Sequence, residues 1–318
     1  MSKLVKIALL MAGSLIFSLA IANVGLWVLK VGDPPIYYRD AAFGYLAVPD
    51  QWPSTRGIPY RINQAGLRGA DFPATKPAGT FRVVFIGDSV TFGGGVVSDS
   101  DTYVVQVADA LARQLHRKVD SVNISAPGWG IENMEAYVER YGLYGADLVI
   151  WVLPFEDLRR PKNEGAGMPT SKSFRIVFLA SHAIQIARSK LRGSEWQAPE
   201  KSDPAILTAN LKSFGHTLDL INQTGAKALV VFFPMGAVAA DSDPQAYREY
   251  QDVARAHGIQ TCDVCAQMNA AGGEALFYDG AHLNSHGEHV AGPLIAQCVA
   301  ERLPSLNVAS VGGAGSLP

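Results

Sequence analysis

Three residues in this chain have the types and spacing of a serine-based catalytic site. Ser89 follows the apolar run "FRVVFIG" at 81–87 and precedes a stretch with a helical pattern. Asp279 and His282 lie close together in "FYDGAHLNSHGEHVAG", near the C-terminus. A serine hydroxyl becomes nucleophilic when a histidine takes its proton and a carboxylate holds that histidine in the correct tautomer. The three residues therefore predict acyl-transfer chemistry, provided that the fold brings them together.

The same residue types also occur in roles outside serine catalysis. The stretch "GDSVTFGGG" matches neither G-x-x-x-x-G-K-[ST] nor G-x-G-x-x-G, and it lacks a G-x-S-x-G elbow, so nucleotide loops and an α/β-hydrolase elbow are disfavoured. Ser89 could simply cap a helix, and His282 could belong to a surface turn. Asp279, His282, His286 and His289 could instead hold a metal ion. We expect neither a metal nor another cofactor.

The elements that must position these residues alternate between strand and helix. Apolar runs predict five strands, at 81–87, 121–126, 147–153, 227–234 and 258–264. The intervening segments show helical spacing, as at Val104, Ala108, Leu111 and Leu115. The first, third and fourth runs are almost continuously apolar, which is typical of buried parallel strands. The pattern predicts a three-layer α/β/α sheet with Ser89 at the carboxyl end of a strand, where such sheets bind ligands.

Two separated blocks resemble those of the SGNH/GDSL hydrolase family. The "GDS" at 87–89 follows the first strand, and the "DGAH" at 279–282 lies near the C-terminus, as in that family. Between them, "VNISAPGWG" resembles the second family block, and "INQAGLRG" at 62–69 resembles the lead-in of membrane-anchored bacterial members. The resemblance covers residues 81 to about 303. It implies a flavodoxin-like sheet with the strand order 2-1-3-4-5.

The resemblance also implies a role for each matching residue. Ser89 would be the nucleophile, His282 the general base and Asp279 the carboxylate that orients it. The backbone N–H groups of Ser89 and Gly128 would bind the oxyanion.

The third family block departs from the pattern at one position. Family members end the third strand with Asn-Asp, and the asparagine donates a hydrogen bond to the oxyanion, whereas "DLVIWVLPFEDL" has Glu156 there and a matching Asp157. An ionised glutamate only accepts hydrogen bonds and would repel the charge that the hole stabilises. Glu156 therefore either carries a proton and donates, or turns away, towards Arg159 or Arg160. The second arrangement leaves two backbone donors in the hole.

The N-terminal segment, residues 1–30, has the composition of a membrane-targeting sequence. The stretch 7–29 carries no charge and is long enough, as a helix, to cross about 30 Å of hydrocarbon. The sequence at 20–22 resembles a signal-peptide cleavage site, but the apolar character continues beyond it and favours an uncleaved anchor. Lys3 and Lys6 predict a cytoplasmic N-terminus, which in a bacterium places the remaining chain outside the inner membrane.

Three further segments flank or interrupt the domain predicted at 81–303. Residues 31–80 are rich in Pro, Gly and Tyr and are expected to wrap on the domain as an extended lead-in. An insertion at 158–203 follows the third strand, and its residues 158–193 hold eight basic residues and one acid, Glu164. Its stretch "FRIVFLASHAIQIARSKLR" predicts either an amphipathic helix on anionic lipid near the anchor or a lid helix over the pocket. Residues 304–318 have the composition of a disordered tail.

The cysteines do not indicate redox catalysis. Cys262 and Cys265 form a C-x-x-C, but Cys262 falls in a predicted strand, whereas the pair of a thioredoxin opens a helix. We expect buried thiols, or a disulfide that involves Cys298 in an oxidising compartment.

The expected function is that of a membrane-anchored serine esterase acting on an ester-bearing small molecule, lipid or envelope polysaccharide. With 27 Lys and Arg against 29 Asp and Glu, the net charge of −2 offers no basic footprint for nucleic acid. If a sugar hydroxyl replaced water as the acyl acceptor, the protein would be an O-acyltransferase of envelope or exported glycans. A catalytically inactive binding or assembly module, which kept the scaffold without the asparagine, is a third hypothesis.

Overall fold

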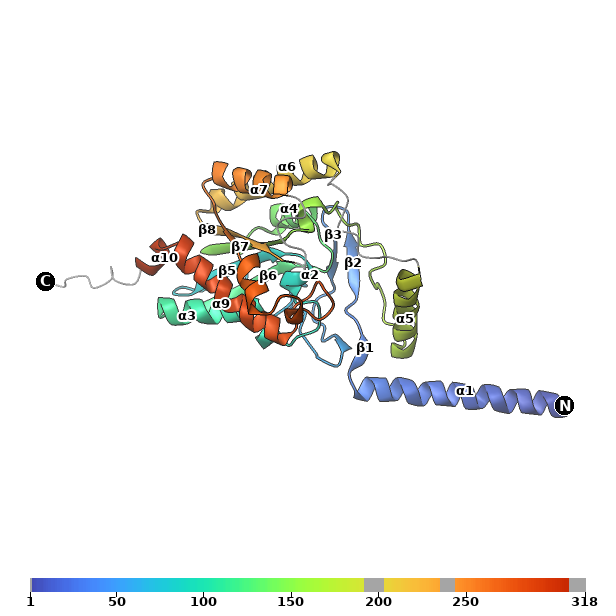
Figure 1. Ribbon diagram of the computed structural model, residues 1–318. Helices are drawn as coiled ribbons and strands as arrows, with labels where there is room; N and C mark the ends of the chain where they lie inside the picture. The colour runs from blue at the N-terminus through green and yellow to red at the C-terminus, as the bar shows by residue number, and fades with distance from the viewer. Residues whose placement is uncertain (1, 192–202, 235–243, 309–318) are drawn as a thin grey trace.

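A five-stranded parallel sheet forms the centre of the protein, whose computed structural model describes residues 2–191, 203–234 and 244–308 (Figure 1). The strands lie in the order β6-β5-β7-β8-β9, and every adjacent pair is parallel. Their bounds are β5 Phe81–Gly87, β6 Val119–Ser125, β7 Leu148–Pro154, β8 Lys227–Phe233 and β9 Gln260–Asp263. The predicted flavodoxin-like order 2-1-3-4-5 is confirmed.

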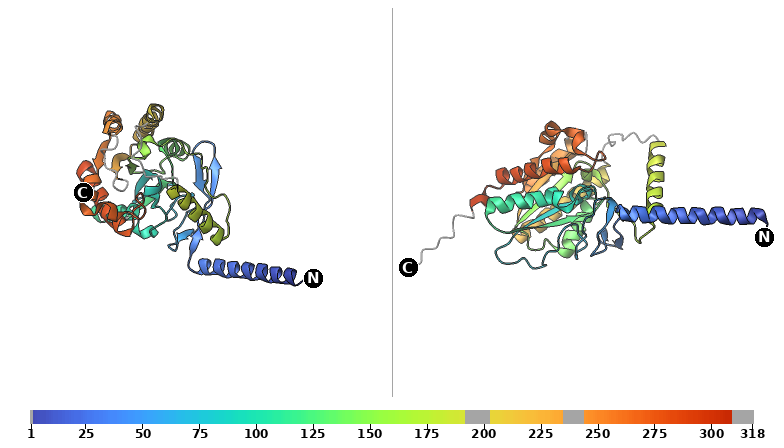
Figure 2. Two further views of the ribbon diagram at one scale, coloured as in Figure 1. Left: turned by 45° about the vertical axis from the view of Figure 1, so that its right-hand side comes forward. Right: turned by 90° about the horizontal axis from the view of Figure 1, so that it is seen from below.

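Helices cover both faces of this sheet and complete the three expected layers (Figure 2). Val83 and Phe85 of β5 pack in one core with α3 and α9, while Val84 and Ile86 pack in the other with α4, α6 and α7. Because successive side chains point to opposite faces, a strand between two helix layers is apolar throughout, as this one is. The helices are α3 Tyr103–Leu115, α4 Ile131–Tyr141, α6 Pro204–Thr224, α7 Pro244–Ala256 and α9 Ser285–Arg302.

Within the described residues, six short elements connect or follow the main ones. They are α2 Ser89–Phe92, η1 Asp99–Asp101, η2 Asp157–Arg159, α8 Cys265–Ala271, η4 Gly273–Leu276 and α10 Ser305–Val308. The segment predicted as a disordered tail thus starts with α10, and its residues 309–318 lie outside the described residues.

The lead-in forms two small antiparallel sheets before it reaches β5. β1 (Val31–Asp33) pairs with β4 (Ser54–Arg56), and β2 (Tyr37–Asp40) pairs with β3 (Gly44–Ala47). The side chains of β3 are buried along its whole length. The lead-in therefore belongs to the packed domain and contributes to its core.

Helix α1 (Lys3–Val28) projects away from the domain (Figure 1). It is the one helix among the described residues that is long and apolar enough to cross a membrane, a test that a signal sequence also passes, and none of its residues is buried. α5 (Arg175–Leu191), which belongs to the basic insertion, packs against α1 and β1. Insertion residues 192–202 lie outside the described residues.

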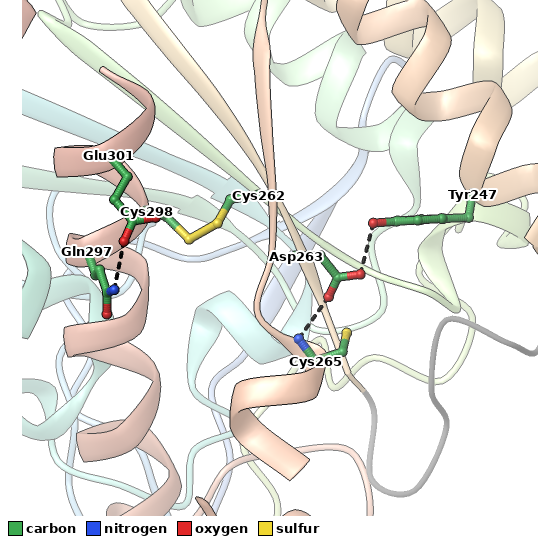
Figure 3. The surroundings of a disulfide bond; sticks show 7 residues. All are labelled: Tyr247, Cys262, Asp263, Cys265, Gln297, Cys298 and Glu301. Carbon is green, nitrogen blue, oxygen red and sulfur yellow. Dashed lines mark hydrogen bonds between the residues drawn. A yellow bond between two sulfur atoms is a disulfide. The ribbon is translucent and has the colours of Figure 1, made fainter. Parts of the chain in front are cut away.

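A disulfide joins Cys262 of β9 to Cys298 of α9 (Figure 3). Cys265 is a free, buried thiol, so the C-x-x-C pair is not bonded to itself. Asp263 accepts hydrogen bonds from the Cys265 N–H and the Tyr247 hydroxyl, at 2.8 Å each. The disulfide fixes the edge strand of the sheet to the helix that follows the Asp279–His282 turn.

Candidate active site

Ser89 stands at the junction of β5 and α2, at the carboxyl end of a central strand. Asp88 caps α2, because its carboxylate accepts a hydrogen bond from the Val90 N–H at 2.8 Å. The Ser89 Oγ lies 3.4 Å from Asp88 Oδ2. A helix start at a strand end directs backbone N–H groups out of the sheet edge, so the serine is displayed where a ligand can reach it.

Asp279 and His282 form a close pair. His282 Nδ1 lies 2.9 Å from Asp279 Oδ1 and 3.0 Å from Oδ2, and Asp279 Oδ1 also accepts from the His282 N–H at 2.9 Å. Partial burial alone would raise the pKa of the Asp279 carboxyl. Hydrogen bonds from the ring and backbone of His282 outweigh that effect and lower this pKa well below its usual value. An ionised carboxylate on Nδ1 holds the imidazole in the tautomer that leaves Nε2 free to take a proton.

The glycine run after Ser89 allows the His282 ring to pack against the turn that carries the serine. A Cβ on Gly94 would come within 2.6 Å of the His282 ring, and the Gly94 N–H donates to the Ser89 carbonyl at 2.9 Å. Gly94 also has φ +56°, a left-handed conformation that favours glycine. No hydrogen bond joins Ser89 to His282 among the described residues, and such contacts often tighten only when substrate is bound.

Arg68 of the lead-in clamps the loop that carries the glycine run. Its buried guanidinium donates to the carbonyls of Phe92 and Val97, at 2.6 Å each, and its Nε donates to Asp99 at 2.9 Å. These contacts hold both ends of the loop that packs on His282. The sequence indicated this segment only through its resemblance to other lead-ins, and it did not predict the role of Arg68.

Gly128 lies on the loop after β6, where two side chains hold its backbone. Asn163 Nδ2 donates to the Gly128 carbonyl at 3.0 Å, and the Tyr45 hydroxyl donates to the Pro127 carbonyl. Gly128 has φ +80°, and a Cβ there would lie 3.0 Å from Asn163. Within the described part of the chain, the Gly128 N–H has no hydrogen-bond acceptor. It is therefore available to a substrate oxygen.

A buried charge cluster adjoins Ser89. Arg160 Nη1 donates to Asp88 Oδ2 at 3.0 Å and to the Trp129 carbonyl at 3.1 Å, and it lies 2.9 Å from Asp157 Oδ1. The Asp157 contact lacks hydrogen-bond geometry, and neither carboxyl oxygen has another partner among the described residues. Complete burial, followed by the nearby Asp88 charge, raises the pKa of Asp157 well above its usual value. The cluster is thus a buried Arg160 guanidinium that contacts two buried carboxyl groups, those of Asp88 and Asp157.

Glu156, the residue that replaces the family's asparagine, lies at the edge of this cluster. Its Oε2 is 3.6 Å from Arg160 Nη2, and its side chain is 37% exposed. This places its carboxylate beside one of the two arginines that the sequence suggested. Arg160 links this position to Asp88 and to the loop that carries Gly128, a connection that sequence reasoning missed.

The residues of the possible metal site do not converge. His282 Nδ1 is held by Asp279, and His289 Nδ1 contacts the Ser285 carbonyl at 2.7 Å. Among the described residues, a cluster of metal-ligand types forms only at Glu135, Glu139 and His216, outside this site.

The comparison with protein families identifies the family of the chain. A model of the GDSL-like lipase/acylhydrolase family matches residues 85–290. The chain belongs to this family. The matched range begins just before Ser89 and includes Gly128, Asp279 and His282, so it contains the GDS, VNISAPGWG and DGAH blocks of this GDSL-like protein, while the lead-in stretch at 62–69 lies before it.

Solved structures of a lipase/acylhydrolase, of TesA and of an esterase match the chain at low sequence identity. A lipase/acylhydrolase from Enterococcus faecalis is 17% identical, with 70% of this chain and 96% of that chain covered and a TM-score of 0.44. A structure of TesA is 15% identical, with 71% and 99% covered and a TM-score of 0.43. The esterase EstA from Pseudoalteromonas sp. is 10% identical, with 70% and 98% covered and a TM-score of 0.44. No curated protein sequence matches the chain.

Proposed function

We propose that this GDSL-like protein is a serine ester hydrolase that uses Ser89, His282 and Asp279 as a catalytic triad. The observation that carries the proposal is the Asp279–His282 pair, 2.9 Å apart, whose imidazole packs on Gly94 in the loop that follows Ser89. An N-capping serine or a surface turn needs neither an oriented histidine nor a glycine that admits its ring.

The reaction would proceed in two acyl-transfer steps. Ser89 Oγ attacks the ester carbonyl carbon while His282 Nε2 takes the hydroxyl proton, and Asp279 stabilises the imidazolium that forms. The N–H groups of Ser89 and Gly128 bind the oxyanion. When the tetrahedral intermediate collapses, the proton passes to the leaving alkoxide and an acyl-serine remains. Water, deprotonated by His282, then releases the acid and restores the serine.

The buried Asp88–Arg160 pair gives the oxyanion loop its support in this proposal. Arg160 contacts Asp88, which precedes the nucleophile, and the Trp129 carbonyl, which follows Gly128. One guanidinium therefore links the two backbone segments whose N–H groups form the hole. Preorganised donors stabilise a transition state without reorganising during the reaction, so this link supports catalysis without the family's asparagine.

The protein would act from a single-pass anchor in the cytoplasmic membrane, with its catalytic domain on the extracytoplasmic side. Support comes from helix α1, which has no buried residue and carries no charge after Lys6, and from Lys3 and Lys6 in its first turns. We expect the protein to stay in membranes through high-salt and alkaline extraction and to retain its N-terminal residues. An N-terminal sequence that starts at Asn23 would show cleavage instead.

Active-site labelling tests the proposal directly. A fluorophosphonate probe should modify Ser89 alone, as read by mass spectrometry, and Ser89→Ala should lower turnover of a short p-nitrophenyl ester by at least about 10³. Ser100, an exposed serine in the neighbouring η1, provides the matched control, and Ser100→Ala should keep both properties. Labelling that persists in Ser89→Ala would refute the assignment.

The same acyl-enzyme also serves to test for transfer. Adding a sugar with free hydroxyl groups as an acyl acceptor during turnover should leave the rate of acid release unchanged if water is the acceptor. A transferase would instead form a new ester at the expense of acid. A well-folded protein that neither labels nor turns over an ester would be the inactive module.

A further inference from the structure

Helix α5 carries an exposed apolar face on the side away from the domain. Phe174, directly before the helix, and Val177 and Ile184 within it are 71%, 55% and 53% exposed. Their spacing of three and seven residues places them on one helix face. The opposite face is the packed one, since Arg175 and Leu179 lie against Gly32 of β1. A soluble domain leaves few large apolar side chains in such a row without a partner.

The orientation of α5 relative to α1 determines which way the exposed apolar face of α5 points. α5 runs across the axis of α1, and it stands on the side of the domain from which α1 projects (Figures 1 and 2). Its outer face therefore looks along α1 towards the N-terminus. If α1 passes through a bilayer, a helix laid across it at this end lies along the bilayer surface.

One contact sets the depth at which α5 would lie. The Ile176 N–H donates to Asn23 Oδ1 of α1 at 3.4 Å. Asn23 precedes Lys30, the first charge after the uncharged span, by seven residues, which is about 10 Å along a helix. Interfacial amphipathic helices lie with their apolar face about 5–10 Å into the boundary of headgroups and acyl chains. α5 meets α1 at that depth.

The charge of the segment fits phosphate headgroups. Residues 165–194 contain no Asp or Glu, and their basic residues are Lys172, Arg175, Arg188, Lys190 and Arg192. An open hollow of about 450 Å³ at the junction of the two helices is lined by Asn23, Lys172, Ser173, Phe174, Arg175 and Val177. Asp33 holds the Lys172 ammonium at 2.6 Å and the Arg175 guanidinium at 2.9 Å, which keeps both cations at its wall.

We propose that α5 is a second membrane contact, which lies in the lipid interface of the bilayer that α1 enters and binds anionic phospholipid headgroups. This inference rests on the proposed anchorage by α1 and adds to it. A single membrane-spanning helix fixes only the distance of a domain from the membrane. A second helix that lies along the membrane surface also fixes the tilt and rotation of the domain relative to the membrane. Of the two roles that the sequence allowed for α5, the structure supports the lipid-bound one, because its contacts are with α1 and β1.

Fluorescence quenching in membranes tests the inference on the full-length chain. An environment-sensitive dye is attached to a single introduced cysteine in each of four variants. Two are on α5, Val177→Cys and Ile184→Cys. The others are Leu15→Cys in the middle of α1 and Ala256→Cys at the exposed end of α7. The proteins are reconstituted in phosphatidylethanolamine/phosphatidylglycerol vesicles that contain doxyl-labelled lipid. The native thiol that is free, Cys265, is buried and supplies the background.

We expect shallow doxyl lipid to quench the labels on α5 at least about two-fold more than the label at Ala256→Cys, and deep doxyl lipid to quench Leu15→Cys most. Quenching of Leu15→Cys without quenching on α5 would overturn the inference and leave the anchor intact. Absence of quenching at both sites would overturn the anchor as well. Disulfide trapping of Val177→Cys with itself, without lipid quenching, would assign this face to a second copy of the chain.

Discussion

Substituting Glu156 tests whether the hole works without a side-chain donor. Its carboxylate is 3.6 Å from Arg160 and 37% exposed, and ion pairs this exposed contribute about 0.2–1 kcal/mol. Arg160 keeps its contacts with Asp88 and Asp157 when Glu156 is replaced, so the cluster should remain in place. Glu156→Gln and Glu156→Ala should therefore each change kcat/KM by less than about five-fold.

A donor role predicts a different pattern. Loss of one oxyanion-hole donor costs about 10² to 10³ in kcat, so Glu156→Ala would be nearly inactive while Glu156→Gln would remain active. Glu156→Gln would also abolish any fall in rate as rising pH ionises the carboxyl.

The assay is kcat/KM for a short p-nitrophenyl ester between pH 6 and 9. Glu164→Gln provides the matched control, because Glu164 is an exposed glutamate, 3.3 Å from Lys162. A hundred-fold loss in Glu156→Ala together with near-normal activity in Glu156→Gln would refute our interpretation of this position. Equal, small effects and an unchanged pH profile would support it.

Three more substitutions probe the triad and its support. Asp279→Asn should lower kcat by about 10⁴, because the amide stabilises the wrong tautomer of His282, while the melting temperature stays within a few degrees. Gly94→Ala should lower kcat, because the added methyl would lie 2.6 Å from the His282 ring and displace it, and it should also lower the melting temperature, because alanine is strained at φ +56°; unchanged turnover would contradict this packing. Glu288 is fully buried, and burial, offset in part by the Tyr103 N–H, raises its pKa from 4.5 to about 8. Because the folded protein holds this proton and the unfolded chain releases it, stability should fall as pH rises from about 4.5 to 8, by on the order of 5 kcal/mol at most, and then level off; Glu288→Gln should remove that slope in denaturant titrations.

The central sheet could be predicted because its strands are buried on both faces. Each predicted strand is present, with ends that differ by up to two residues. β6 begins at Val119 rather than 121, and its first three residues are half-buried, with the polar Asp120 and Ser121 interrupting the apolar pattern. β9 begins at Gln260 rather than 258, because Gly258 takes a left-handed conformation, φ +72°, that closes the turn after α7.

The four short strands of the lead-in could not be predicted from the periodicity of apolar residues. β1 and β4 have three residues each, and β2 and β3 have four, so no alternation has room to develop. β3 is buried along its length because it lies between the domain and the insertion, for example where Tyr45 reaches Pro127. Such burial depends on segments that are distant in the chain.

The candidate site shows the same division between local and distant information. Asp279 and His282 are three residues apart, so a sequence pattern can reveal their pairing, and their catalytic role with Ser89 stays a prediction. Arg160 contacts Asp88 and Trp129, which are 72 and 31 residues away in the sequence. A local pattern within the basic insertion therefore could not indicate its position. Only the folded chain shows that this arginine belongs to the site.

The junction between α1 and the first small sheet has a mechanical consequence. Directly after α1, the Lys30 carbonyl accepts hydrogen bonds from the Gly57 N–H and the Ser54 hydroxyl, so the chain enters β-structure without a flexible spacer. Arg56, in the same strand β4, lies 3.9 Å from Asp279.

A flexible linker of ten residues would let a tethered domain move by roughly 17 Å, because the end-to-end distance of such a linker is about 5–6 Å times the square root of its number of residues. Because no such linker follows α1, an anchored enzyme would hold its active site at a fixed distance from the membrane. Esters held at that height would meet the serine by diffusion in two dimensions. Esters attached further out would have to bend back towards the surface before they could react.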